Sequence, residues 1–140
     1  MSAFGRQVVL VPVDYSDESK RALAAGCEAV ATSGILHVTH VIPSPPVGVV
    51  SPGTSSEERA KHGMAELEQY LSQAGVTGCL KIHILEGDPG HEIVKLADVL
   101  QADLIVMPSH GRTGLAHVLI GSVAERVVRL AHCPVLVLRK

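Results

Sequence analysis

Aromatic residues are nearly missing from this sequence: its 140 residues include two tyrosines, one phenylalanine and no tryptophan. Proteins that bind single-stranded nucleic acid stack the bases on aromatic side chains, and this chain has almost none to offer. Its formal net charge of −2 also provides no strongly basic surface for duplex nucleic acid or an anionic membrane. We therefore expect neither nucleic acid nor a membrane among its partners.

Cysteine is scarce as well, and no apolar run is long. The three cysteines, Cys27, Cys79 and Cys133, do not form a C-x-x-C motif, and we interpret them as small core residues of a reduced protein. No segment approaches the roughly 18 apolar residues that a membrane-spanning helix requires, and the N-terminus lacks the pattern of a secretory signal. These absences predict a cytoplasmic protein without membrane insertion.

What the sequence does have is a regular alternation of strand and helix patterns. Short runs rich in Val, Ile and Leu alternate with amphipathic segments that carry helix-capping residues. The order β-α-β-α-β-α-β-α-β is typical of an α/β fold with one open parallel sheet and helices on both faces. The expected strands are 7–13, 35–42, 79–86, 103–107 and 134–138, and the expected helices are 16–34, 55–75, 88–102 and 122–131.

Capping residues set most of the expected helix ends. Ser16 is placed to cap the first helix, and Gly34 is placed to end it. The second helix has two candidate capping boxes, Thr54 with Glu57 and Ser55 with Glu58, and Asp88 is placed to cap the third helix. Ser122 with Glu125 forms another capping box at the start of the last helix. The apolar stripe expected on the first helix consists of Ala22, Leu23, Cys27 and Val30.

The two most apolar strands, the first and the fourth, are expected at the centre of the sheet. This gives the strand order 3-2-1-4-5 in a single Rossmann-like domain spanning residues 1–140. Ligands of such sheets bind at the carboxyl ends of the strands, where the strand order reverses. The segments at that point are 12–16 and 107–114. The long loop 43–54, with four prolines and two glycines, is a further candidate for function.

The segment MPSHGRTGLAHVLIGSVAERV, which follows the fourth strand, has the elements of a phosphate site. Gly111 and Gly121 let a phosphate approach backbone amides, and the Ser122 hydroxyl with the amides of Ser122 and Val123 would meet it at a helix N-terminus. Asp14, just past the first strand, is placed to accept a hydrogen bond from a ribose or a base. The alternative is that the glycines are turn residues and that Ser122 only caps its helix.

Three segments of the chain share their pattern with one known family. They are VVLVPVDYSDESKRAL, ILHVTHVIP and EGDPGHEIVKLADVLQADLIVMPSHGRTGLAHVLIGSVAERVVRLAHCPVLVL, and together they make the chain resemble the universal stress protein family along nearly its whole length. Nucleotide-binding members carry the motif G-x2-G-x9-G-[ST] after the fourth strand. Gly111, Gly121 and Ser122 match three of its four elements.

The resemblance implies a stress-response protein that binds ATP or another adenine nucleotide, with or without Mg²⁺, and acts more as a regulator than as an efficient enzyme. It also implies a homodimer that pairs the C-terminal strand, 134–140, across a two-fold axis. An unpaired apolar edge strand would otherwise invite aggregation. The residues implied at the adenine and ribose are Pro12, Val13, Asp14 and Val41, the last through its backbone, and those implied at the ribose and phosphates are Met107, Gly111, Gly121, Ser122 and Val123.

Pro108 is the departure from the motif, because it stands where the first glycine belongs. Proline removes an N–H donor, fixes φ near −65° and adds bulk beside the expected ribose and phosphates. The loss of one hydrogen bond is of order 1 kcal/mol, so we expect nucleotide binding to be retained but weakened. The alternative is a steric block. It would leave a vestigial site in a dimeric interaction module whose loop 43–54 contacts an unknown protein partner.

Catalysis has little support in the sequence. Only His110 and Asp14 are titratable near the expected site, and there is no Walker A lysine motif, so ATP hydrolysis would be slower than ~1 s⁻¹. We interpret His110 as a loop or structural histidine rather than as a general base, whereas Arg112 fits an exposed loop as well as a phosphate contact. A receiver-type signalling domain would need a lysine after the fourth strand, which is absent. Six further histidines lack metal-ligand spacing and are expected at surface or boundary positions: His37, His40, His83, His91, His117 and His132.

Overall fold

The computed structural model describes residues 5–45, 48, 55–76, 78, 80–110 and 120–139, and every structural statement below concerns these residues. Strands and helices alternate along the chain as the sequence predicts. In chain order they are β1 (Arg6–Pro12), α1 (Asp17–Ala29), β2 (Val30–Ile42), α2 (Ser56–Gln73), β3 (Leu80–Glu86), α3 (Pro89–Leu100), β4 (Leu104–Pro108), α4 (Ser122–Leu130) and β5 (Val135–Leu138).

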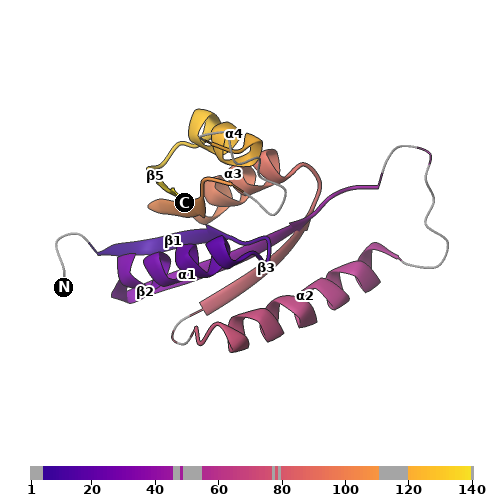
Figure 1. Cartoon of the computed structure of the whole chain (residues 1–140), viewed down its shortest axis with the longest axis horizontal. Helices are drawn as coiled ribbons and strands as arrows, with labels where there is room; N and C mark the ends of the chain where they lie inside the picture. The colour runs from indigo at the N-terminus through magenta and orange to yellow at the C-terminus, as the bar shows by residue number, and fades with distance from the viewer. Residues whose placement is uncertain are drawn as a thin grey trace.

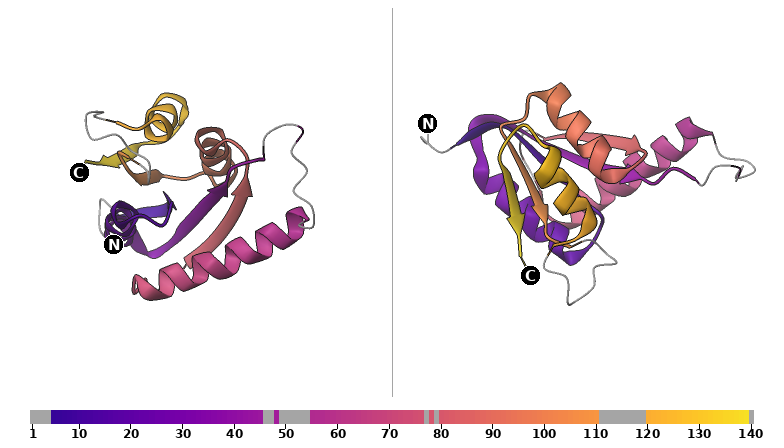
Figure 2. Two further views of the ribbon diagram at one scale, coloured as in Figure 1. Left: turned by 45° about the vertical axis from the view of Figure 1, so that its right-hand side comes forward. Right: turned by 90° about the horizontal axis from the view of Figure 1, so that it is seen from above.

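The strands form one parallel sheet of order β3-β2-β1-β4-β5, which confirms the predicted fold class and strand order. Helices α1 and α2 cover one face of the sheet, and α3 and α4 cover the other (Figure 1). The two further views in Figure 2 show the same three layers, with α3 beside α4. Because every strand runs the same way, all five carboxyl ends lie along one edge, where ligands of such sheets bind.

The core has one apolar cluster on each face of the sheet. Val9 and Val11 of β1 pack toward α1 and α2, whereas Leu10 packs toward α3 and α4 with Ile105 and Met107 of β4. β1 is therefore buried on both faces, as its continuous apolar run predicts.

The first helix ends earlier than the sequence predicted. α1 stops at Ala29, and Gly34, expected as its C-terminal glycine, lies inside β2. A Cβ atom on Gly34 would come within 2.7 Å of the backbone oxygen of Arg6 and 2.8 Å of that of Gln7. The glycine is thus required by a close approach of β2 to β1, at the irregular start of their pairing.

The buried face of α1 also differs from the predicted stripe. Cys27 is exposed, so its interpretation as a core residue was wrong, and Val30 belongs to β2. Gly26 packs on the sheet where Cys27 was expected, and an added Cβ on Gly26 would lie 2.6 Å from Cγ2 of Val11. Cys133 is partly buried, and Cys79 lies outside the described residues. The buried residues of α1 are Ser19, Ala22, Leu23 and Gly26.

Three of the helices have the side-chain caps that the sequence predicted. Ser16, Ser55 and Asp88 each accept a hydrogen bond from a backbone N–H in the first turn of α1, α2 and α3. The fourth helix does not: its N-cap is Gly121, with no side-chain cap bond, and Ser122 is the first helical residue. The predicted Ser122 capping box was therefore wrong.

One buried histidine contradicts the expectation of surface or boundary positions. His37 is only 5% exposed, and its Nδ1 lies 2.8 Å from Nε2 of His83, with the two rings stacked at a centroid distance of 5.1 Å. This contact joins β2 to β3, which lies at an edge of the sheet as the predicted strand order requires. In the part of the chain that is described, no helix has both the length and the apolar character to cross a membrane.

Candidate functional site

The carboxyl ends of β1 and β4 are not paired with each other. Their ladder comprises Val9 with Leu104 and Leu10 with Ile105, although β1 continues to Pro12 and β4 to Pro108. This is the topological switch point, because β2 lies on one side of β1 and β4 on the other. We call the ends of β1, β2 and β4, together with the start of α4, the switch-point site.

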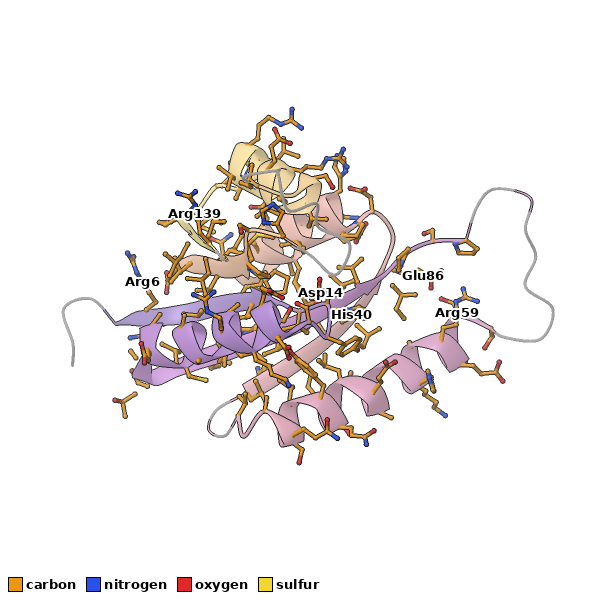
Figure 3. The ribbon with its side chains drawn as sticks, in the orientation of Figure 1. Arg6, Asp14, His40, Arg59, Glu86 and Arg139 are labelled. Atoms are coloured by element: carbon orange, nitrogen blue, oxygen red, sulfur yellow. The ribbon has the colours of Figure 1, made fainter. Side chains whose placement is uncertain are left out.

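Asp14 stands at the end of β1 with its carboxylate held in one orientation. Its Oδ1 accepts hydrogen bonds from Oγ of Ser16 at 2.5 Å, Oγ of Ser19 at 2.7 Å and the N–H of Ser16 at 3.1 Å. In Figure 3, Asp14 lies beside His40, the β2 residue that bonds to the neighbouring Val13 carbonyl. A carboxylate has about four lone-pair positions, so an oriented Asp14 can also accept a hydrogen bond from a ligand hydroxyl.

Two neighbouring elements fasten the loop that follows β1. His40 of β2 donates a hydrogen bond from Nδ1 to the Val13 carbonyl at 2.9 Å, and the Tyr70 hydroxyl of α2 donates to the Ser16 carbonyl at 3.0 Å. Between these contacts Tyr15 adopts a left-handed conformation, with φ of 68°, and its ring lies 4.5 Å from that of His40. Burial raises the pKa of Tyr15 to about 12, so the phenol is neutral.

The backbone of Val41 points toward the switch-point site. The N–H of Val13 donates to the carbonyl of Thr39, whereas the N–H of Gly87, beyond β3, donates to the carbonyl of Ile42. Backbone groups of successive strand residues alternate in direction, so those of Val41 face the β1 side, like those of Thr39. Pairing with β1 ends at Thr39, so the Val41 backbone reaches past it.

The same alternation shows what Pro108 removes. The N–H groups of Ile105 and Ser109 donate to the carbonyls of Pro134 and Leu138, on the β5 side. The nitrogen of Pro108 therefore faces the β1 side, where β4 has no ladder partner at this level. Proline here breaks no hydrogen bond of the sheet, and the donor that it removes is one that would face the site.

The start of α4 lies against the end of β4. The N–H of Gly121 donates to the carbonyl of Ser109 at 2.5 Å, so this amide is engaged within the protein. The amides of Ser122 and Val123 belong to the first turn of α4, where an N–H has no acceptor inside the helix, and α4 has no side-chain cap. These two amides, with the Ser122 hydroxyl, are the donors that α4 offers to an anion.

The structure brings the predicted residues of β1, β2, β4 and α4 to one edge of the sheet. The side chains of Val13, Val41 and Met107 are buried in the core, so these residues would meet a ligand mainly through their backbones. Gly111 and Arg112 lie outside the described residues, as does most of loop 43–54.

Several residues that shape the site were not predicted as part of it, among them Ser19, His40 and Tyr70. The sequence holds a weak local signal for Ser19, which lies one helical turn after Ser16. It holds none for His40 and Tyr70, because their contacts join segments that are distant along the chain.

Known proteins resemble the chain over nearly its whole length. The profile of the universal stress protein family matches residues 5–139. Universal stress protein MJ0531 of Methanocaldococcus jannaschii is 42% identical over 141 aligned positions, which cover 94% of this chain and 81% of the relative.

Two similar solved structures contain an adenine nucleotide. A universal stress protein in complex with cAMP has a TM-score of 0.67 and 28% identity, and the match covers 96% of this chain and 97% of that one. The universal stress protein of Archaeoglobus fulgidus in complex with dAMP has a TM-score of 0.64 and 27% identity, with 96% and 98% covered.

Proposed function

Because the chain belongs to the universal stress protein family, we propose that it binds an adenine nucleotide at the switch-point site and acts as a regulatory dimer in the stress response. The cAMP and dAMP complexes of similar proteins support a nucleotide as the ligand class. For this chain we propose ATP, because the first turn of α4 supplies amide donors for a phosphate tail.

The observation that carries the proposal is the alignment of three kinds of group along one edge of the sheet. The Val41 backbone offers a donor and an acceptor that suit the edge of an adenine ring. Asp14 offers an oriented carboxylate for a ribose hydroxyl. The amides of Ser122 and Val123 offer a helix N-terminus to phosphate.

A bound Mg²⁺ ion would depend mainly on the nucleotide. Among the described residues, no group of three or more His, Cys, Asp or Glu side chains is arranged to hold a metal ion. Mg²⁺ usually keeps several waters and binds through phosphate oxygens with only one or two carboxylates. We therefore propose that Mg²⁺, where present, enters with ATP.

Calorimetric titration with ATP tests the proposal, with Asp14→Asn as the diagnostic variant. Saturable binding is expected for the natural protein, and Asp14→Asn is expected to weaken it about tenfold, because the hydrogen bond to a charged acceptor is lost. Asp17→Asn is the matched control, since Asp17 is an exposed carboxylate three residues further on. No saturation at millimolar ATP, or equal loss in both variants, would contradict the proposed site.

The proposed dimer uses β5, the edge strand next to β4. Leu136 in the middle of β5 is 43% exposed, and Val128 and Leu130 of α4 are exposed as well. An exposed apolar edge strand readily pairs with another strand, and a two-fold axis would bring two copies of β5 together.

The second candidate function is a dimeric interaction module with a vestigial site. Two observations favour it: Pro108 supplies no donor on the β1 side, and the Gly121 amide is already bound to Ser109. The two functions predict different effects of Pro108→Gly: ATP binding becomes tighter if the site is functional, and it appears only in the variant if the site is vestigial.

A further inference from the structure

A polar cluster joins the start of α3 to α4, close to the switch-point site. Asp88, the N-cap of α3, accepts hydrogen bonds at Oδ2 from Nη1 of Arg126 at 2.9 Å and from Nδ1 of His91 at 2.7 Å. The hydrogen bonds from the side chain and the backbone N–H of His91, and then the bond from Arg126, hold the pKa of Asp88 at about 2, well below its usual range, so the carboxylate is ionised. The cluster thus combines one anion with the guanidinium of Arg126, and it plays no part in the function proposed above.

The aliphatic stem of Arg126 is fixed by α3. A Cβ atom on Gly90 would lie 2.6 Å from Cδ of Arg126 and 3.0 Å from its Cβ and Cγ, so the stem rests on the bare backbone of that glycine. The same small residue lets α3 and α4 pack side by side, as Figure 2 shows. Packing therefore orients Arg126 even before its charge is considered.

The orientation places the guanidinium near the first turn of α4. Arg126 follows Ser122 by four residues, so the two side chains share a face of the helix. Side chains on an α-helix lean toward its N-terminus, so Arg126 reaches back over the turn that begins at Ser122. The bond to Asp88 uses one of the five N–H donors of the guanidinium, and the others suit phosphate oxygens.

We propose that Arg126 is a specificity-determining residue that binds nucleotide phosphates beyond the first, so that the protein prefers ATP to AMP. This inference rests on the nucleotide site proposed above. The first phosphate would occupy the amides of Ser122 and Val123, and a longer tail would extend along α4 to the guanidinium. The cAMP and dAMP complexes of similar proteins contain one phosphate each and so make no use of such a position.

Arg126→Met tests the proposal, because methionine keeps an unbranched stem on Gly90 and removes the charge. ATP and AMP are titrated into the natural protein and into the variant, both with excess Mg²⁺. ATP affinity is expected to fall about tenfold in Arg126→Met, as for the loss of one charge-assisted hydrogen bond, while AMP affinity changes less than twofold. The matched control is Arg129→Met on the same helix, where Arg129 pairs with Glu125 at 3.8 Å. It removes the same charge one turn further from Ser122.

The outcomes separate this inference from the nucleotide site itself. A specific loss of the ATP preference in Arg126→Met, absent in Arg129→Met, supports it. Equal losses for ATP and AMP would show that Arg126 only joins α3 to α4, and this result overturns the inference while the nucleotide site stands.

Failure of the natural protein to bind any nucleotide overturns the proposed function. The phosphate contact of Arg126 is then tested separately, by titration with inorganic tripolyphosphate. In that titration of the natural protein, a shift of the Arg126 side-chain NMR signals would support the phosphate contact, and its absence would overturn it.

Discussion

Pro108 is the residue on which the affinity of the proposed site most directly depends. Its nitrogen faces the β1 side, so Pro108→Gly would direct a new N–H toward the nucleotide without disturbing the bonds between β4 and β5. We expect ATP to bind about fivefold more tightly, which corresponds to one neutral hydrogen bond of ~1 kcal/mol. Calorimetry or equilibrium dialysis measures the change.

The control for this substitution is Pro134→Gly, which removes a proline just before β5 and should leave the affinity unchanged. ATP binding that is present only in Pro108→Gly would favour the vestigial site. Unaltered affinity in Pro108→Gly would show that the added N–H does not reach the ligand.

At the residue scale, local spacing predicted the positions of the site but not how its side chains are held. Gly121 and Ser122 precede a helix, and this can be read from a short stretch of sequence. The N-cap was misplaced by one residue, because Gly121, which has no side-chain bond, takes that position instead of Ser122. The contact of His40 with the Val13 carbonyl depends on two strands being neighbours, so no local pattern encodes it.

At the scale of the elements, small residues account for the errors. Gly34 resembles a helix C-terminal glycine, but it is required where β2 passes close to β1. Gly26 and Ser19 are buried on the face of α1 that packs on the sheet. A pattern based on apolar residues overlooks them and places Cys27 on that face instead. In both cases the decisive factor is the distance between two segments, which a single-sequence pattern does not contain.

The contact between β2 and β3 predicts a pH dependence of stability. Burial, and then the nearby positive charges of His83 and Lys81, lower the pKa of His37, and burial and Lys81 lower that of His83. The unfolded chain, whose histidines titrate near pH 6.5, therefore takes up protons first as the pH falls. The stability contributed by this pair is complete above about pH 6.5 and is lost below it.

His83→Gln removes one titrating group from this contact and provides the test. Urea denaturation at pH 7.5 and 5.5 measures the free energy of unfolding of both proteins. We expect the natural protein to lose more stability on acidification than the variant does. An equal loss in both would show that the contact between β2 and β3 is not the pH-sensitive element.

At the scale of the whole molecule, the strand order was the most predictable property. The most apolar strands are expected to be the most buried, so the sequence places β1 and β4 at the centre of the sheet. Right-handed crossover connections then leave few possible positions for the other strands. The switch-point site follows from that order alone, before any residue is assigned a role. The quaternary structure does not follow in this way. The strand order shows which strands lie at the edges of the sheet, but it does not show whether another subunit covers them.

The proposed dimer is tested at the edge strand by Leu136→Asp. A charge in the middle of β5 would be buried without a partner in a strand-to-strand dimer, so we expect the dimer to dissociate into monomers. Sedimentation equilibrium at several protein concentrations measures the molecular mass. Val99→Asp is the control, because Val99 is 80% exposed on α3, outside the edge strand, and its replacement should leave the dimer intact. A natural protein that remains monomeric, or a Leu136→Asp variant that remains dimeric, would exclude β5 as the interface.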